Sequence, residues 1–595
     1  MGGACSTTDS MFEVGELFCS TCDGSEWRNT RIKGSLVRPR VWRLPPMEGE
    51  DFPELRLMPQ LKDRTANVGV ALSGGGIRAC CEGLGVLMVL HQTGMLPLVR
   101  YVSSVSGGSW VNAAFSYLPD DKSMEEFLAP GVLPPSELSM TRLADVAPRS
   151  MLKACGDAKT LCSIAACLCG QDICCCVRSS YLSAWNETVT MPYLKPFGLF
   201  KLGSVVSTPI GTEGHARAVE AVAEAGVEVL PMRKGLPFPI INASSNVGPD
   251  PRGQKFTPVE FTPLYWGTPA LQLQAQGGPI GGGGVEAFGA GAPAPNKLRD
   301  NRKEVLDGEV VEQTPTTFMP LAFAAGTSSF AVPVRCSSTS AHRAQGGPTM
   351  QQWSAADITS GSNGRTSFLD GGFVDNSGVL ALLRRRVEVI VAQLSSLEGV
   401  DDSPNGITYM QAVWWPSLFG AAEDSSMLGV HDEHINEQNQ VFASELWSPL
   451  LARMRDMQRK GEAVTFVDTY DVLTNTLAGV SGGWSVTIIW CVNSVADSFK
   501  KSLPSDTQEA LARDPHIADC FGGDGIVDIS NRFPFPSTLS SGYTSTLCSL
   551  LAQNSAYNLM TVEDKLREML QPSRPVLLGR SSDKDMKRKD QDMKV

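Results

Sequence analysis

The sequence has no run of about 18 consecutive apolar residues, the length that a membrane-spanning helix requires, so we expect no transmembrane segment. Its longest candidate, residues 163–177, is interrupted by Gln171 and Asp172. Basic residues are outnumbered as well, at 51 Lys and Arg against 63 Asp and Glu, which gives a net charge of −12. This balance argues against a nucleic-acid partner and against docking on anionic lipid by charge alone.

Cysteine is too sparse for a secreted disulfide scaffold, because the chain holds only 16 cysteines among 595 residues. The first residues, Met-Gly-Gly-Ala-Cys-Ser, also lack the basic stretch and the apolar core of a secretory signal. We therefore expect reduced thiols and a cytoplasmic protein.

The same N-terminus matches the N-myristoylation pattern, with Gly2 as the acceptor. One myristoyl chain gives only marginal membrane affinity, and residues 1–27 contain no Lys or Arg to strengthen it. Cys5 is then the expected second anchor, as a palmitoylation site. This interpretation makes residues 1–30 a lipid-anchored tether that holds the protein on the cytosolic face of a membrane. The alternative is a chance match to a short pattern.

Hydrophobic residues make up 42% of the chain, which is ample for a large core. Residues 67–72 form a predicted buried strand that ends at a glycine turn, and a helical pattern of apolar residues follows. Residues 100–104 predict a second strand, again followed by a glycine turn and a helix. Two such units in succession favour an α/β fold with a central, mostly parallel sheet. Further strands are expected at 387–394 and 486–492, and the last helix at 544–557.

The sequence between these units is less regular. Residues 277–296, GGPIGGGGVEAFGAGAPAPN, are rich in Gly, Ala and Pro, which predicts a mobile segment. We expect this segment to be part of, or adjacent to, a lid over the functional site, or else to be a plain disordered surface loop. The sequence contains no internal repeat, so we interpret the interruptions as insertions into one large domain.

Ser106 lies in Ser104-Val105-Ser106-Gly107-Gly108, between the second predicted strand and its helix. In the nucleophile elbow of serine hydrolases, a sharp turn at such a junction lifts the serine hydroxyl off the strand edge, and small neighbours let the backbone pass closely. Ser104 departs from the usual Gly-x-Ser-x-Gly pattern, because it adds a side chain where glycine is usual. The alternative is an ordinary Gly/Ser turn.

A second glycine turn, Ser73-Gly74-Gly75-Gly76-Ile77-Arg78, follows the first strand. Three glycines at the start of a helix expose backbone N–H groups to a developing negative charge, which is what an oxyanion hole requires. Similar turns bind phosphate in nucleotide-binding proteins, but the Gly-Lys-Ser/Thr of a Walker loop does not follow here. An oxyanion hole is therefore favoured.

Asp370 precedes two glycines in Leu369-Asp370-Gly371-Gly372 and is the candidate base, although such an aspartate is often only a turn or helix cap. Because a free Asp has a pKa of about 3.9, burial or geometry must supply the basicity that activates a serine. A Ser–His–Asp triad stays open as an alternative, since His431, His434 and His516 follow the aspartate. We expect no metal site, because His431 and His434 have no obvious third ligand.

Taken in order, SGGGIRA, YVSSVSGGSW and LDGGFVDNSG resemble the catalytic core of the cytosolic phospholipase A2 and fungal lysophospholipase family, relatives of patatin. The segments KFTPVEF, AGTSSF and FPFP agree with this resemblance. It implies a patatin-like three-layer α/β sandwich with a large inserted cap or lid region. It also implies a Ser–Asp dyad with Ser106 as nucleophile and Asp370 as base, oxyanion donors at Gly74, Gly75 and Gly76, and Arg78 as a cation near the lipid phosphate.

The resemblance further implies a membrane-associated serine lipid acyl hydrolase, a carboxylic ester hydrolase that cleaves fatty-acyl esters of glycerophospholipids without a cofactor. Its partners are then the phospholipid membrane and a phospholipid or lysophospholipid substrate. Residues 31–572 are interpreted as the catalytic domain, with cap insertions at about 120–360, and residues 573–595 as a charged tail. The alternatives are a lysophospholipase or general esterase, and a catalytically inactive lipid-binding scaffold.

Overall fold

The structure of the protein is a computed structural model. It describes residues 36–46, 49–64, 66–158, 189–246, 256–269, 273–275, 278–280, 283–291, 308–315, 318–330, 349–351, 365–395, 415–422, 432–513, 526–527, 533–536 and 542–570. Gly2, Cys5 and the charged tail at 573–595 lie outside the described residues. Among the helices in these ranges, none combines the length and the hydrophobicity needed to cross a bilayer.

Both predicted strand–turn–helix units are present. The buried strand β2 (Val68–Leu72) leads through glycines into the helix α5 (Gly76–Gln92). β3 (Val99–Val105) leads in the same way into α6 (Gly107–Ser116). The later expectations are confirmed as well, by β14 (Val389–Leu394), β16 (Trp484–Val492) and α23 (Ser545–Met560).

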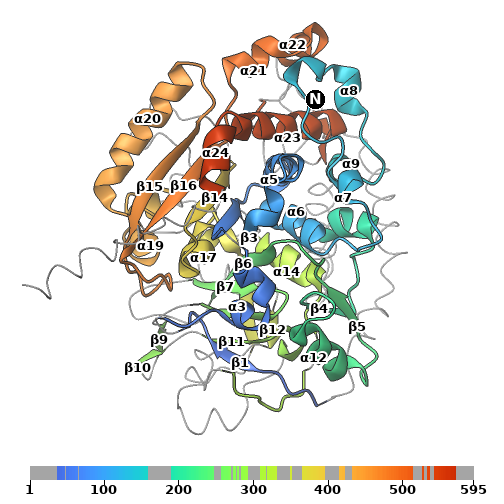
Figure 1. The fold of residues 1–595 in the computed structure, drawn as a ribbon, viewed down its shortest axis with the longest axis vertical. Coiled ribbons are helices and arrows are strands. Elements are labelled where there is room, and N and C mark those ends of the chain that lie inside the picture. Colours follow the sequence, from blue (N-terminus) through green and yellow to red (C-terminus); the bar gives the residue numbers. More distant parts are fainter. Residues whose placement is uncertain are drawn as a thin grey trace, which may run out of the picture.

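The described residues form a 12-stranded mixed sheet that runs through the molecule (Figure 1). Its centre is parallel, as expected, in the order β6 (Phe238–Asn246), β3, β2, β14 and β16. Antiparallel strands extend it beyond β16 with β15 (Thr465–Val472), and beyond β6 with β7 (Thr257–Phe261), β8 (Tyr265–Thr268), β11 (Gly283–Glu286) and β1 (Val41–Arg43). Off this path, β13 (Arg365–Asp370) pairs with β6 and with β12 (Thr349–Gln351).

Two consecutive serines near the end of β3 show how helices cover both faces of the sheet. Side chains alternate between the faces along a strand. Asn112 Nδ2 of α6 donates to Ser104 Oγ at 2.8 Å. Ser103 Oγ donates to the carbonyl of Gly378, just before α17 (Val379–Arg384), at 2.6 Å. α6 therefore lies on one face, and α17 lies on the opposite face.

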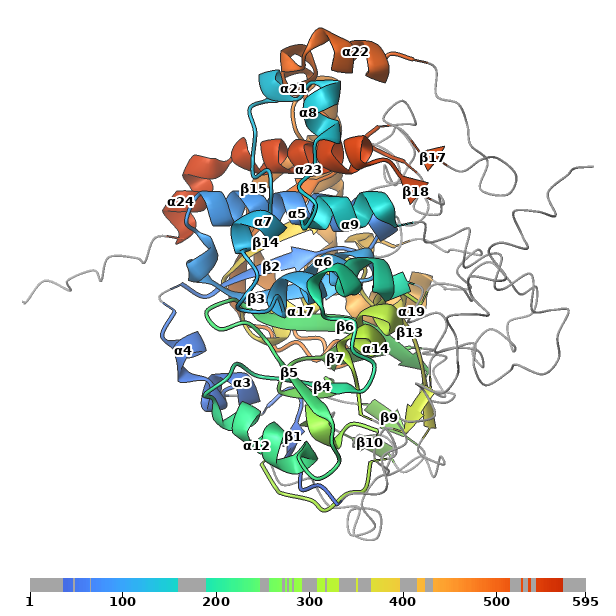
Figure 2. The ribbon, with the colours of Figure 1, turned by 90° about the vertical axis from the view of Figure 1, so that its right-hand side faces the viewer.

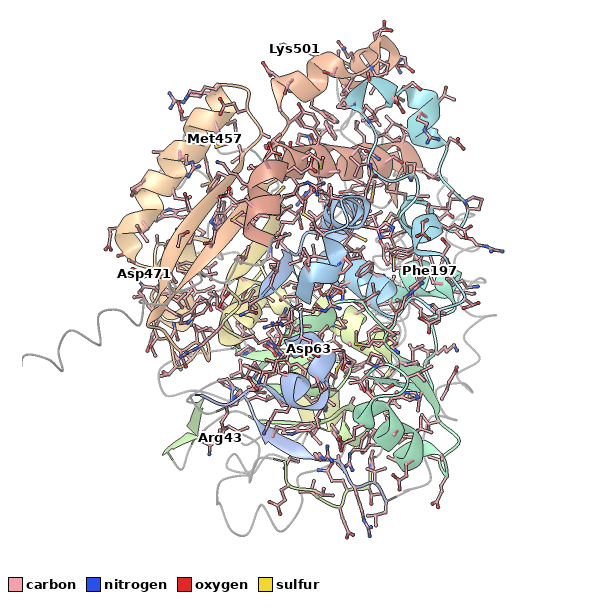
Figure 3. All side chains as sticks on the ribbon, viewed as in Figure 1. Arg43, Asp63, Phe197, Met457, Asp471 and Lys501 are labelled. Atoms are coloured by element: carbon pink, nitrogen blue, oxygen red, sulfur yellow. The ribbon has the colours of Figure 1, made fainter. Side chains whose placement is uncertain are left out.

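A second helical layer covers the face that carries α5, where α23 lies alongside α5 in both ribbon views (Figures 1 and 2). The two helices are in backbone contact at Gly85, because a Cβ added there would lie 2.2 Å from the Ala552 carbonyl oxygen. At the β15 edge of the sheet lies α20 (Trp447–Arg459), whose Arg453 pairs with Asp468 at 2.6 Å. Figure 3 labels Met457 of α20 near this edge.

The remaining elements are short. The helices are α3 (Pro53–Leu57), α4 (Pro59–Lys62), α7 (Met124–Phe127), α8 (Met140–Ala144), α9 (Met151–Asp157), α12 (Glu213–Val222), α14 (Leu321–Ser328), α19 (Asp432–Asn439), α21 (Asp497–Ser502), α22 (Ser505–Leu511) and α24 (Glu563–Leu570). The 3-10 turns are η1 (Leu96–Leu98), η2 (Pro135–Glu137), η3 (Lys195–Phe197), η4 (Ala287–Gly289), η6 (Gly371–Phe373) and η7 (Ser444–Leu446). Within the described part of the chain, three strand pairs lie outside the main sheet: β4 (Ser204–Ser207) with β5 (Glu228–Pro231), β9 (Leu273–Ala275) with β10 (Gly278–Ile280), and β17 (Ile526–Val527) with β18 (Gly542–Tyr543).

The glycine-rich segment at 277–296 was expected to be mobile and to be part of, or adjacent to, a lid. The expected mobility is wrong for the residues of β11, which pair within the main sheet. Glycine allows β8 and β11 to approach each other closely, because a Cβ added at Gly267 of β8 would lie 2.2 Å from the Gly283 carbonyl oxygen of β11. The range expected to hold the cap insertions, about 120–360, also supplies β6, β7 and β8 of the same sheet.

Candidate active site

Ser106 and Asp370 come together because two strands end head to head against β6. β3 runs parallel to β6, and its last residue, Val105, pairs with Asn242. β13 runs antiparallel to β6, and its last residue, Asp370, pairs with Ala243, the next position along. The C-terminal ends of β3 and β13 therefore meet at one place in the sheet, although 264 positions separate Ser106 from Asp370.

Ser106 has a strained backbone, with φ at 49° and ψ at −122°. A conformation of this kind costs about 1–3 kcal/mol and persists only where the surroundings enforce it. The Ser106 Oγ donates a hydrogen bond to Asp370 Oδ2 at 2.9 Å. The sharp turn expected between β3 and α6 is thus present, and it directs the serine hydroxyl at the carboxylate.

The glycines after Ser106 are required because the two glycine turns pass each other in backbone contact. A Cβ added at Gly107 would lie 2.1 Å from the Gly76 carbonyl oxygen, and one at Gly108 would lie 2.5 Å from that of Leu72. Since β2 and β3 are neighbouring parallel strands, the turns that follow them share one edge of the sheet. A larger residue at Gly107 would force the two turns apart.

Asp370 is buried, and each oxygen of its carboxylate accepts a hydrogen bond. Its Oδ1 accepts from the N–H of Gly372 at 2.8 Å, which caps η6, while its Oδ2 accepts from Ser106. Burial raises the pKa of Asp370 from 3.8 to about 7, against the lowering effect of these two hydrogen bonds. With this pKa the carboxylate is a much stronger base than a free aspartate.

Gly74, Gly75 and Gly76, at the start of α5, differ in the hydrogen-bond partners of their N–H groups. The Gly74 N–H donates to the carbonyl of Asn376 at 3.0 Å, so this amide is not free to act as an oxyanion donor, contrary to expectation. Gly75 and Gly76 are partly exposed, and among the described residues their N–H groups have no acceptor. They lie at the positive end of α5, close to the elbow, since a Cβ added at Gly74 would lie 3.0 Å from Ser106 Cβ.

Arg78 was expected near a lipid phosphate, and the structure places it elsewhere. Its side chain is buried, with Nε donating to Ser395 Oγ at 2.8 Å and Nη1 donating to the carbonyl of Pro536 at 2.6 Å. Its Nε also lies 3.9 Å from Glu82 Oε1, one turn further along α5. Because α5 is buried over most of its length, its third residue is held by protein groups, and the expectation is corrected.

Ser104, the departure from the usual elbow pattern, has a defined place. It is fully buried, and its Oγ donates to the carbonyl of Ile240 at 3.3 Å and accepts from Asn112 at 2.8 Å and Ser109 at 3.1 Å. The hydroxyl thus ties β3 to β6 and to α6. The added side chain therefore does not crowd the turn at Ser106.

Two neighbours of Ser106 and Asp370 were not identified from the sequence. Ser328 Oγ accepts the N–H of Ser106 at 2.9 Å. Asn376 fills the space beside the first glycine turn, since a Cβ added at Gly74 would lie 2.1 Å from its Oδ1. Both residues lie in segments that carry the family resemblance, AGTSSF and LDGGFVDNSG, but no spacing rule assigns them a role.

The histidines considered for a triad, His431, His434 and His516, have no described side chain. In the structure the Ser106 hydroxyl contacts the Asp370 carboxylate directly, without an intervening imidazole. The expected acylation sites Gly2 and Cys5 also lie outside the described residues.

Comparison with known proteins finds short matches to fungal phospholipases, and no protein-family model matches the chain. Phospholipase B of Cryptococcus neoformans var. grubii is 36% identical over 90 residues, which are 13% of this chain and 13% of that protein. Phospholipase B of Cryptococcus neoformans var. neoformans is 34% identical over 90 residues, again 13% of each chain. The chain thus matches about an eighth of the length of these relatives.

Among solved structures, human GIVD cytosolic phospholipase A2 aligns with 86% of this chain and 64% of its own, at 13% identity and a TM-score of 0.45. The same protein in complex with methyl gamma-linolenyl fluorophosphonate aligns with 86% of this chain and 61% of its own, at 14% identity and a TM-score of 0.38. With the motifs around Ser106 and Asp370, the findings from the curated proteins are consistent with the cytosolic phospholipase A2 and lysophospholipase family.

Proposed function

We propose that the protein is a serine lipid acyl hydrolase that cleaves fatty-acyl esters of glycerophospholipids through a Ser106–Asp370 dyad. The observation that carries the proposal is the 2.9 Å hydrogen bond from the strained Ser106 to the buried Asp370. A nucleophile within hydrogen-bond reach of a base is the arrangement that covalent ester hydrolysis requires. The elevated pKa of Asp370, about 7, suits a base that works near neutral pH.

The chemistry proceeds in two halves. Asp370 Oδ2 takes the proton of Ser106 as the Oγ attacks the acyl carbonyl, and it returns that proton to the alcohol that leaves. A water molecule then attacks the acyl-serine with Asp370 again as the base, which releases the fatty acid and restores the serine. Every proton is thus taken up and returned by one carboxylate.

The oxyanion formed in each half is stabilised by backbone N–H groups. Gly75 and Gly76 offer amides that have no acceptor among the described residues, and the helix that begins at Gly76 adds a positive partial charge. Gly107, the residue after the nucleophile, starts α6 and lies in backbone contact with Gly76. We assign the oxyanion hole to these three amides.

We infer the substrate class from the resemblance to known phospholipases and not from the geometry of the site. The curated relatives are named phospholipase B, and the motifs resemble cytosolic phospholipase A2 and lysophospholipases. The Ser–Asp pair suits any carboxylic ester that reaches it, so a lysophospholipase or general esterase uses the same chemistry. A scaffold that binds lipid without turnover keeps the fold and lacks the covalent step.

The test combines covalent labelling with product analysis on the purified full chain. A fluorophosphonate should modify Ser106, located by peptide mass spectrometry, and mixed phospholipid vesicles should release free fatty acids. Ser106→Ala and Asp370→Asn should each abolish both results. The matched control is Ser116→Ala, which removes a buried hydroxyl bonded to Asn112 Oδ1 at the far end of α6.

The outcomes separate the candidate functions. Fatty acid released only from lysophospholipids or short-chain esters would support the alternative enzymes. A folded wild-type chain without labelling or product would support the inactive scaffold. Turnover that persists in Ser106→Ala would end the proposal for this site.

Contact with the membrane is a second part of the proposal and rests on the N-terminal pattern. Myristate on Gly2 with palmitate on Cys5 would give the two anchors that stable attachment needs. In cell fractionation, Gly2→Ala should move the protein out of the membrane fraction, and Cys5→Ser should leave it weakly bound. If Gly2→Ala stays in the membrane fraction, attachment must come from elsewhere in the chain.

A further inference from the structure

We propose that two groups in the segment that ends α14, the Ser328 hydroxyl and the Phe330 carbonyl, hold Ser106 and Asp370 in position relative to each other, with the Ser328 hydroxyl as the positioning group. This inference rests on the proposed function, since it concerns how the nucleophile and the base are held in register. Ser328 contacts the backbone of the nucleophile, and Phe330, two residues later, contacts the backbone of the base.

The first contact is made at the strained residue itself. Ser328 Oγ is buried, accepts the Ser106 N–H at 2.9 Å and donates to the Asn242 carbonyl at 2.6 Å. The same Oγ is also hydrogen-bonded to Ser109 Oγ of α6 at 2.9 Å. A hydroxyl can make these bonds together because it is a donor and an acceptor at once. A backbone with φ at 49° holds only where its surroundings enforce it, and this hydrogen bond fixes the peptide group of Ser106 on the N-terminal side of the turn.

The second contact is made at the base. The Asp370 N–H donates to the carbonyl of Phe330 at 3.1 Å. The Phe330 ring is buried in a small apolar cluster with Leu369 and Phe373, the residues that flank the Asp370 turn. The segment therefore holds Asp370 by its backbone and by the side chains on both sides of it.

Asn242 of β6 completes the frame. Its carbonyl accepts from Ser328, and a Cβ added at Gly371 would lie 2.4 Å from that same oxygen. Its Nδ2 donates to the Ser104 carbonyl at 3.0 Å, just before the elbow. One β6 residue is thus in contact with the turn of the nucleophile, the turn of the base and the Ser328 hydroxyl.

The neighbouring serine provides a matched control. Ser329 Oγ accepts from Trp110 Nε1 at 3.1 Å and donates within α14 to the Gly326 carbonyl at 3.0 Å. It is as buried as the other residues of this helix end, yet its side chain has no hydrogen bond to Ser106 or Asp370 among those recorded in the structure. Ser328→Ala and Ser329→Ala therefore delete the same group one position apart, and only the first deletion removes a contact to the nucleophile.

The experiment measures kcat, KM and the rate of fluorophosphonate labelling at Ser106 on the full chain, with melting temperature as the measure of folding. Ser328→Ala should lower kcat and the labelling rate by about 100-fold, the effect of a displacement of about 1 Å, while KM changes little. Ser328→Cys keeps a side chain of similar size but is a weak acceptor, and it should fall between wild type and Ser328→Ala. Ser329→Ala should keep kcat near wild type even where its melting temperature falls as much.

The results distinguish a failure of the proposed function from a failure of the positioning role alone. Wild-type protein without turnover or labelling would overturn the proposed function and this inference with it. Active wild type with Ser328→Ala equal to Ser329→Ala in kcat would overturn the positioning role alone. If Ser328→Ala does not fold, the comparison is made with Ser328→Cys, and wild-type kcat in that variant would overturn the positioning role.

Discussion

The Ser106 Oγ lies 2.9 Å from Asp370 Oδ2, and no third side chain stands between them. This contact is made at the point of β6 where β3 and β13 end from opposite directions, at Asn242 and Ala243. An aspartate that faces a serine directly must have its basicity raised by its surroundings, and burial raises the pKa of Asp370 to about 7.

The first prediction concerns the pH dependence of turnover. Asp370 must be ionised to take the proton of Ser106, so activity should be low in acid and should rise as the pH passes through the pKa of Asp370, about 7. The check is kcat/KM for a soluble, uncharged ester measured from about pH 5 to about pH 9. A rate that already reaches its plateau at about pH 5 would contradict the assignment of Asp370 as the base.

The second prediction concerns stability at the same residue. Because the pKa of Asp370 is raised from 3.8 to about 7, the folded state binds more protons than the unfolded state between these values. The stability that this proton contributes is present in acid and is lost as the pH rises toward 7. The free energy of unfolding of Asp370→Asn minus that of wild type should therefore increase from about pH 5 to about pH 8. The expected increase is on the order of 1–3 kcal/mol.

Chemical denaturation at both pH values measures this difference. The variant carries the other titrating groups of the wild type, so subtracting the two pH dependences isolates Asp370. A difference that does not change with pH would show that Asp370 is not desolvated.

The third prediction concerns the contact between the two glycine turns. The Cβ introduced by Gly107→Ala would lie 2.1 Å from the Gly76 carbonyl oxygen, which must move the elbow away from the first glycine turn. We expect fluorophosphonate labelling and turnover to fall by at least about 100-fold. The control is Gly83→Ala within α5, whose Cβ would meet only side chains, those of Val111 at 3.3 Å and Leu72 at 3.5 Å. Equal activity of the two variants would contradict the close approach of the turns.

The fourth prediction concerns Arg78, whose guanidinium is bonded to Ser395 and Pro536. Arg78→Met should lower stability by about 2–5 kcal/mol, because it removes a buried charged group and leaves the bonds of its partners unmade. It should reduce kcat/KM for a phospholipid and for an uncharged ester by the same factor. Thermal unfolding and the ratio of the two rates provide the check. A loss confined to the phospholipid would favour a contact with the lipid phosphate instead.

Local sequence signals were sufficient to predict the two strand–turn–helix units that carry the first glycine turn and Ser106. β2 and β3 are short apolar runs followed by glycines and a helical period, and the structure has them within one or two residues of the expected positions. Ser106 was identified because an elbow needs small neighbours in sequence, and Gly107 and Gly108 are adjacent to it. These features depend on neighbouring residues, which a sequence displays directly.

The tertiary structure alone decided what depends on residues far apart in the chain. Gly283 and Gly284 belong to a strand because they pair with Thr268 and Gly267 of β8, and the same composition in isolation predicts a loop. Arg78 is buried because α5 is enclosed by its neighbours, a fact that its place after three glycines does not reveal.

The contact between Ser106 and Asp370 also depends on residues that are far apart in the chain. It depends on the pairing of β3 and β13 at adjacent positions of β6, and Ser328 reaches the elbow only through that arrangement. The sequence by itself predicted Ser106 and Asp370 as candidate residues, and it determined the glycine turns in which they lie. The distances between those groups, and the burial that raises the pKa of Asp370, were decided by packing, because both depend on contacts between segments that are hundreds of positions apart.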